Sequence, residues 1–164
     1  MQVEHRVAAI CDANVLIDYL DSDEDIIREL VAYWGTVHVP TRVLHEVKTL
    51  SAERAVGLGL SVIETPLVLP PTPGLSGPDR ACLHFALAEG WVCITNDRPL
   101  RRECGRLGCK VVWGLEMLLL LVADGQISKA RSKGIAEQIA TINPEITISL
   151  LESFYEKLES IKPE

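Results

Sequence analysis

Four carboxylates occupy positions where the predicted strands end or the predicted helices begin. They are Asp12, Glu46, Asp79 and Asp97. Asp12 ends the apolar run VAAICD and Asp97 ends WVCITND, and both runs are typical of buried strands. Ligands of open α/β sheets gather beyond the carboxyl ends of the strands, so we expect these acids to face one crevice. Acids at one sheet edge repel each other unless a cation neutralises them, which predicts a divalent-metal site.

Oxygen-only donors favour Mg²⁺ or Mn²⁺ as the cofactor. A bound ion of this kind lowers the pKa of a water molecule, which can then attack phosphorus in line. We assign Asp12 and Asp97 as the core metal ligands. Glu46 and Asp79 complete the shell or hold metal-bound water. The predicted chemistry is hydrolysis of phosphodiester bonds.

Each acid also has a purely structural explanation. Asp12 and Asp79 both precede or open helical segments, where a carboxylate can cap the helix. Glu46, taken singly, is typical of an exposed helix position. Asn14 lies two residues past Asp12, where it either bonds to that carboxylate or caps the helix. Asp18 is predicted to lie on the surface.

The segment around Asp97 carries further polar candidates. Thr95 and Asn96 end the same strand and can orient a metal ligand or a phosphate. Four arginines then follow on roughly one predicted helical face: Arg98, Arg101, Arg102 and Arg106. This face is predicted to hold the phosphates of a nucleic-acid strand. The alternative is a solvated face with Glu103 as its counter-charge.

The pattern of the chain predicts an α/β fold. Apolar runs that read as strands alternate with helical segments, at 7–12, 36–40, 60–65, 91–95 and 110–113. This alternation predicts a three-layer α/β/α arrangement around a mostly parallel sheet of about five strands. Three further helices are expected at 115–123, 128–140 and 146–159. We expect one domain over 1–164, with a core at 1–125 and a C-terminal helical extension at 126–164.

Composition narrows the functional class. The chain has 164 residues, 48% of them hydrophobic, and a net charge of −7, which argues against non-specific coating of nucleic acid. A nuclease remains compatible, because part of this charge belongs to the proposed site. Five cysteines without a C-x-x-C pair indicate neither a disulfide framework nor a zinc site. The start MQVEHRV lacks the plan of a signal peptide, and we expect a cytoplasmic protein. The three tryptophans are expected in the core.

Four segments occur in the order CDANVLIDYL, VLHEV, SGPDRACLHFALAEG and ITNDRPLRRECGRLG. Together they resemble the PIN-domain fold of metal-dependent ribonucleases, over roughly residues 7–125. The resemblance places the four acids in the family's acidic quartet, with Asn14 and Thr95 at its accompanying polar positions. Resemblance to VapC-type toxins further implies RNA cleavage with Mg²⁺ or Mn²⁺, a silencing antitoxin protein and a homodimer. The helices after residue 125 extend past that compact plan and resemble another PIN subgroup.

Two other classes stay open on the sequence. One is a non-catalytic binding module that retains the fold, in which the acids serve as helix caps. The other is an aspartate-based phosphatase of haloacid-dehalogenase type with Asp12 as nucleophile. That chemistry usually requires a second aspartate two residues later, where this chain has Asn14.

Overall fold

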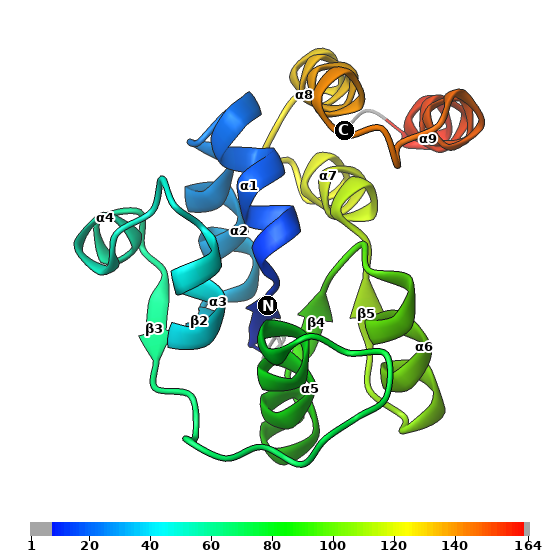
Figure 1. Cartoon of the computed structure of the whole chain (residues 1–164). Coiled ribbons are helices and arrows are strands. Elements are labelled where there is room, and N and C mark those ends of the chain that lie inside the picture. Colours follow the sequence, from blue (N-terminus) through cyan, green and yellow to red (C-terminus); the bar gives the residue numbers. More distant parts are fainter. Residues whose placement is uncertain (1–7, 163–164) are drawn as a thin grey trace, which may run out of the picture.

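A computed structural model describes residues 8–162 (Figure 1). The segment MQVEHRV, including the first residue of the predicted 7–12 strand, lies outside the described residues. Five short strands form one sheet in the order β3-β2-β1-β4-β5, and every pairing is parallel. They are β1 (Ala9–Cys11), β2 (Val37–Pro40), β3 (Ser61–Ile63), β4 (Val92–Ile94) and β5 (Val111–Val112). The predicted α/β sheet is therefore confirmed, with strands shorter than the apolar runs suggested.

The strand order reverses between β1 and β4. The chain first adds β2 and β3 on one side of β1, and then returns to add β4 and β5 on the other. In this register Cys11 pairs with Ile94, and the Asp12 N–H donates to the Ile94 carbonyl at 3.1 Å. A crevice opens at such a reversal in parallel sheets, beyond the carboxyl ends of the two strands.

The helices complete three layers. They are α1 (Ala13–Ser22), α2 (Ile26–Trp34), α3 (Thr41–Glu46), α4 (Ala52–Gly57), α5 (Gly77–Glu89), α6 (Arg98–Arg106), α7 (Gly114–Ala123), α8 (Lys129–Ile142) and α9 (Ile148–Ser160). Helix α5 packs on β1, β2 and β4 and on α6, while α2 packs on β2 and α7 (Figure 1). Coverage of both faces explains why β1 and β4 are entirely buried and continuously apolar. None of the described helices is long and apolar enough to cross a membrane.

The two C-terminal helices pack against the rest of the chain. Helix α8 contacts α1 and α7, and α9 contacts α7 and α8, so both stack at the top of Figure 1. Ile139 of α8 and Phe154 of α9 belong to the same hydrophobic cluster as the strands. Arg131 adds ion pairs to Asp23 at 3.0 Å and Glu29 at 3.1 Å. The extension predicted at 126–164 is thus fastened to α1 and α2 by apolar and charged contacts.

Several local predictions need correction. Helix α4 was not predicted, although Ser51 caps it by accepting from the Arg54 N–H at 3.1 Å. The N-cap of α3 is Pro40, and the hydroxyl of Thr41, the first residue of the helix, bonds to Thr65. The five cysteines are free, in agreement with the sequence.

Candidate metal centre

Asp12 lies at the strand reversal and is almost completely buried, with 1% of its surface exposed. It is the N-cap of α1, and its Oδ1 accepts the Val15 N–H at 2.9 Å. The prediction that Asp12 can cap the helix that follows it is therefore confirmed. The other carboxylate oxygen, Oδ2, accepts a hydrogen bond from the Thr95 hydroxyl.

Thr95 connects the first acid to the last. It is fully buried at the end of β4, and its Oγ1 also accepts the Asp97 N–H at 3.0 Å. Asp97 is the N-cap of α6 and accepts the Leu100 N–H at 2.9 Å. Asn96 points elsewhere, since its side-chain oxygen accepts the Gly114 N–H at 2.9 Å. Thr95 thus has a contact to the Asp12 carboxylate, whereas Asn96 anchors the start of α7.

Asp79 lies in the first turn of α5 rather than at its cap. Ser76 is the N-cap, and its hydroxyl bonds to the Asp79 N–H at 3.3 Å and to Asp79 Oδ2 at 2.9 Å. The idea that Asp79 caps the helix is therefore wrong. Glu46 is the last residue of α3 and is exposed. Asn14 is exposed inside α1, so it does not cap that helix.

The electrostatics of the four acids show that they are neighbours. Burial raises the pKa of Asp12 to about 7, although the hydrogen bonds from Thr95 and Val15 act against it, and the charges of Asp79 and Asp97 raise it further. Burial likewise raises the pKa of Asp79, where Asp97 and Glu46 add their repulsion. Each of the four acids therefore acts on at least one other. We call Asp12, Glu46, Asp79 and Asp97 the acid cluster.

The acid cluster suits a hard divalent cation in donor type and in charge. All four side chains are carboxylates, the ligands that Mg²⁺ and Mn²⁺ prefer. A nearby cation would counter the burial and the mutual repulsion that raise these pKa values. Within residues 8–162, however, no three histidine, cysteine or acidic side chains are close enough to hold one ion. The four acids therefore influence each other's charge, but the described residues do not place three of them around one ion.

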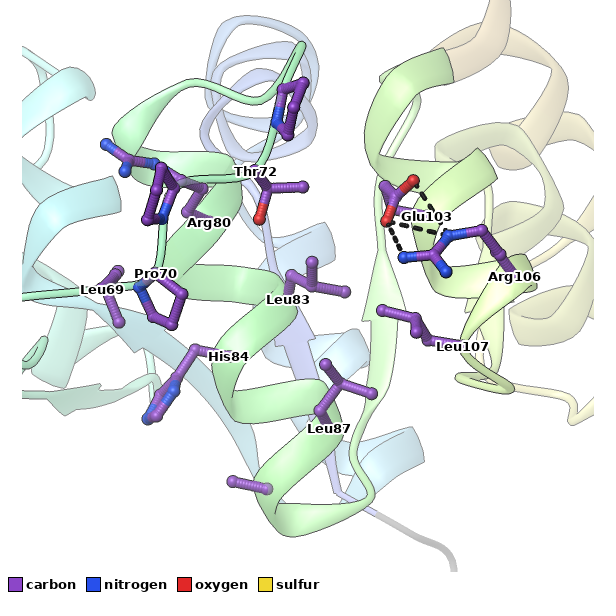
Figure 2. Close-up of a pocket in the computed structure, with 13 residues that line it drawn as sticks. Leu69, Pro70, Thr72, Arg80, Leu83, His84, Leu87, Glu103, Arg106 and Leu107 are labelled. Atoms are coloured by element: carbon purple, nitrogen blue, oxygen red, sulfur yellow. Dashed lines mark hydrogen bonds and ion pairs between the residues drawn. The ribbon is translucent and has the colours of Figure 1, made fainter.

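Three of the four arginines of α6 border hollows, and they do not border the same one. Arg98 and Arg101 border a 450 Å³ cleft that Asp97 also lines. Arg106 faces a larger pocket of 640 Å³ between α5 and α6, and it pairs with Glu103 at 2.9 Å (Figure 2). That larger pocket includes none of the acid cluster among its described lining residues. Glu103 is thus the counter-charge of Arg106, as the sequence suggested.

Two residues were misjudged from the sequence. Asp18 was expected on the surface, but it is 7% exposed and accepts a hydrogen bond from the Asn143 amide at 3.0 Å. Trp34 is buried and Trp91 packs on the core as expected. Trp113 instead lines the 450 Å³ cleft, and the Arg101 guanidinium lies 3.2 Å from the centre of its ring. The sequence around Trp113 gives no sign of this contact, because Arg101 lies 12 residues earlier in the chain.

Comparison with known proteins supports the fold. No family model and no curated protein matches this chain. A solved structure, described as a PilT N-terminus domain protein SSO1118 from the hyperthermophilic archaeon Sulfolobus solfataricus P2, is similar with a TM-score of 0.55. The match has 13% sequence identity and covers 70% of this chain and 93% of that one. The fold is PIN-like. At this identity the likeness shows the PIN-like fold alone and does not favour the VapC type.

Proposed function

We propose that this PIN-like protein is a metal-dependent endoribonuclease that hydrolyses RNA phosphodiester bonds with Mg²⁺ or Mn²⁺. The observation that carries the proposal is the acid cluster itself. Four carboxylates, two just past the ends of β1 and β4 and two in helices α3 and α5, act on one another at the strand reversal, where parallel sheets bind their ligands. A fold gains no stability from gathering like charges there, so a cation and its substrate explain the arrangement.

In this proposal Asp12 and Asp97 would hold the ion, and Asp79 and Glu46 would hold water bound to it. An ion bound there would supply an activated water and neutralise charge on the phosphate. Thr95 fixes the Asp12 carboxylate, because one hydroxyl contacts both Asp12 and the Asp97 backbone. Hydrogen bonds from neighbouring side chains to a metal-binding carboxylate orient it towards the ion. Asn14, exposed one residue beyond Ala13, lies beside this carboxylate in sequence and can contact the substrate.

The cationic side chains beside Asp97 have a role in binding the substrate. Arg98 and Arg102 are exposed on α6, directly after the acid cluster. Phosphate contacts from such arginines position a strand without reading its sequence. The pairing of Arg106 with Glu103 makes Arg106 the weakest contributor of the four arginines.

The biological setting follows from the resemblance to VapC-type toxins. On that basis we propose a cytoplasmic toxin that acts as a homodimer and is silenced by an antitoxin protein. Co-expression with the product of an adjoining small reading frame tests this part separately. Growth arrest that the neighbour relieves supports it, and growth arrest without relief points to a PIN-like nuclease outside toxin–antitoxin pairs.

The nuclease proposal is tested by cleavage of single-stranded RNA with and without Mn²⁺. Asp12→Asn and Asp97→Asn should each lower the rate by more than about a hundredfold, since loss of an outer-shell partner alone costs about 10–100-fold. Both substitutions keep an oxygen that can cap the helix, so folding should persist. Asp25→Asn, at an exposed position before α2, is the matched control and should leave the rate unchanged. Normal cleavage by Asp12→Asn would refute the assignment.

A non-catalytic module is the second candidate, and one observation favours it. Asp12 and Asp97 both cap helices, and Asp79 bonds to the cap of a third helix. These bonds give three of the four acids a structural role without metal. Titration calorimetry with Mn²⁺ separates the two candidates. Heat that disappears in Asp97→Asn supports the metal site, and the absence of binding at millimolar metal supports the module.

A further inference from the structure

The 450 Å³ cleft beside Asp97 is built partly by the C-terminal extension. One wall consists of the start of α6 and Trp113, and the other contains Glu145, Thr147 and Leu150 from the turn and first residues of α9. The volume lies within the ~300–1,000 Å³ usual for small-molecule sites. Because Asp97 belongs both to this wall and to the acid cluster, a ligand in the cleft lies directly beside the proposed site of hydrolysis.

The wall formed by α6 and Trp113 has a flat, cationic surface. The Arg101 guanidinium lies over the Trp113 ring, with 3.2 Å between its central carbon and the ring centre. Burial and the nearby charge of Arg98 lower the pKa of Arg101, whereas Glu116 and Asp97 act in the opposite direction. Trp113 is not among the described residues that pack on the hydrophobic core, and its ring also borders a separate 120 Å³ hollow. The stacked pair is therefore accessible from the cleft and is not simply core packing.

The charges that line the cleft balance, because Asp97 and Glu145 are matched by Arg98 and Arg101. A phosphate that enters fully would add a negative charge beside the two carboxylates. A nucleobase has no such charge, and its exocyclic N–H groups can donate to a carboxylate such as Glu145. Single-stranded RNA is recognised in this way, by stacking of unpaired bases on aromatic rings or arginine planes. Arg98, at the edge beside Asp97, remains available to the adjoining phosphate.

We propose that the cleft binds one unpaired base of a single-stranded RNA, stacked on the Arg101–Trp113 pair and enclosed by the turn before α9. This inference rests on the proposed nuclease function and adds a substrate class and a role for the C-terminal extension. It assigns Trp113 and Arg101 as substrate-binding residues. It also predicts that duplex RNA, whose bases are already stacked and paired, is a poor ligand.

The test measures binding of a short single-stranded RNA in metal-free buffer, by anisotropy of a label on the RNA. Trp113→Ala and Arg101→Ala should each weaken binding by about tenfold, the usual effect of removing one base-stacking partner. Trp113→Phe retains a ring and should recover most of the affinity. Arg102→Ala is the matched control, because Arg102 is the exposed neighbour on the same helix and does not line the cleft. It removes the same charge and should have a smaller effect.

A strand with abasic positions separates stacking from charge. It keeps every phosphate, so Arg101→Ala and Arg102→Ala should weaken its binding equally, and Trp113→Ala should leave it unchanged. Equal losses for both arginine variants on normal RNA, or equal binding of duplex and single strand, would overturn the base site. Failure of the nuclease proposal has a different outcome: base-dependent binding without Mn²⁺-dependent cleavage. If the wild type cleaves RNA and Trp113→Ala cleaves it with an unchanged KM, only the base site is rejected and the nuclease proposal stands.

Discussion

Two buried aspartates, one at the N-cap of α1 and one within this helix, have different surroundings, although burial raises the pKa of both. Asp12 reaches a pKa of about 7 and Asp18 a pKa of about 6. Asp12 lies in the acid cluster, where Asp79 and Asp97 repel its charge. Asp18 lies at the α1–α8 junction, which we define by its hydrogen bond to Asn143. Acidic neighbours act on both, since Asp21 and Glu145 also repel the charge of Asp18. A raised pKa thus marks burial in both places, and only the position of Asp12 at the strand reversal distinguishes a candidate site from a structural contact.

The two regions also differ in what satisfies the carboxylate. Asp12 accepts from a hydroxyl just past the end of β4 and from a backbone N–H in the first turn of α1. Asp18 receives an amide from the segment that joins α8 to α9, so its bond ties the extension to α1. Removing the charge should therefore have different consequences in the two regions, and four experiments examine this difference.

Asp12→Asn should give the largest change in stability. In metal-free buffer at pH 8 we expect the free energy of unfolding to rise by about 2–4 kcal/mol, because an ionised buried group is replaced by a neutral one of the same shape. The raised pKa means that the folded protein binds more protons than the unfolded chain between about pH 4 and 7. Wild-type stability should therefore fall as pH rises through this window, and the gain in the variant should shrink towards pH 4. Urea unfolding of the wild type and the variant at several pH values measures these differences in stability.

The converse result at Asp12 would be informative. Should Asp12→Asn lower the stability at pH 8, the carboxylate would be serving mainly as a helix cap, and the case for the non-catalytic module would strengthen. Asp25→Asn again serves as the control, and it should leave the free energy of unfolding unchanged in these measurements.

Asn143→Ala should weaken the α1–α8 junction by about 1–3 kcal/mol, because it leaves the buried Asp18 carboxylate without its amide donor. Urea unfolding at pH 7 measures the loss. In an Asp18→Asn background the same substitution should cost less, and the difference gives the coupling between the two side chains. Full additivity of the two changes would show that the hydrogen bond contributes nothing. RNA cleavage should stay within a small factor of the wild type if the variant is folded.

Asp18→Asn alone should stabilise the protein by about 1–2 kcal/mol at pH 7, less than Asp12→Asn, because its raised pKa is nearer the ordinary aspartate value. The stability that Asp18 contributes to the wild type is present at low pH and declines as pH rises from about 4 to 6. That part of the pH dependence should be missing from the variant. An unchanged pH profile between 4 and 6 would mean that Asp18 is ionised in the folded protein over that range.

The pH dependence of Mn²⁺ affinity should come from Asp12 in the acid cluster and not from Asp18. A metal binds the ionised carboxylate, so affinity should rise by about tenfold, or about 1.4 kcal/mol, for each pH unit below 7 and level off above it. Calorimetry in buffers of different ionisation heat should detect the released proton. Asp18→Asn should leave this profile unchanged, whereas Asp12→Asn should abolish it. A profile that moved with Asp18 would place the ion at the α1–α8 junction.

The sequence by itself determined the order and kind of the main elements and the positions of the four acids along them. Local signals suffice there: continuous apolar runs form strands covered on both faces, and carboxylates at strand ends or in first helical turns are visible in one dimension. The parallel sheet followed from the alternation of strands and helices. Short elements were the exception, since α4 has only 6 residues and little amphipathic pattern.

Only the tertiary structure decided which of these residues meet. The register of β1 with β4 places Thr95 against Asp12, although 83 positions separate them in the chain. Packing of α8 on α1 buries Asp18, a residue whose own sequence surroundings are acidic and typical of a surface. The stacking of Arg101 on Trp113 depends on the turn between β5 and α7, and the facing wall comes from α9. These contacts arise from chain segments far apart in sequence, and periodicity and propensity carry no information about them.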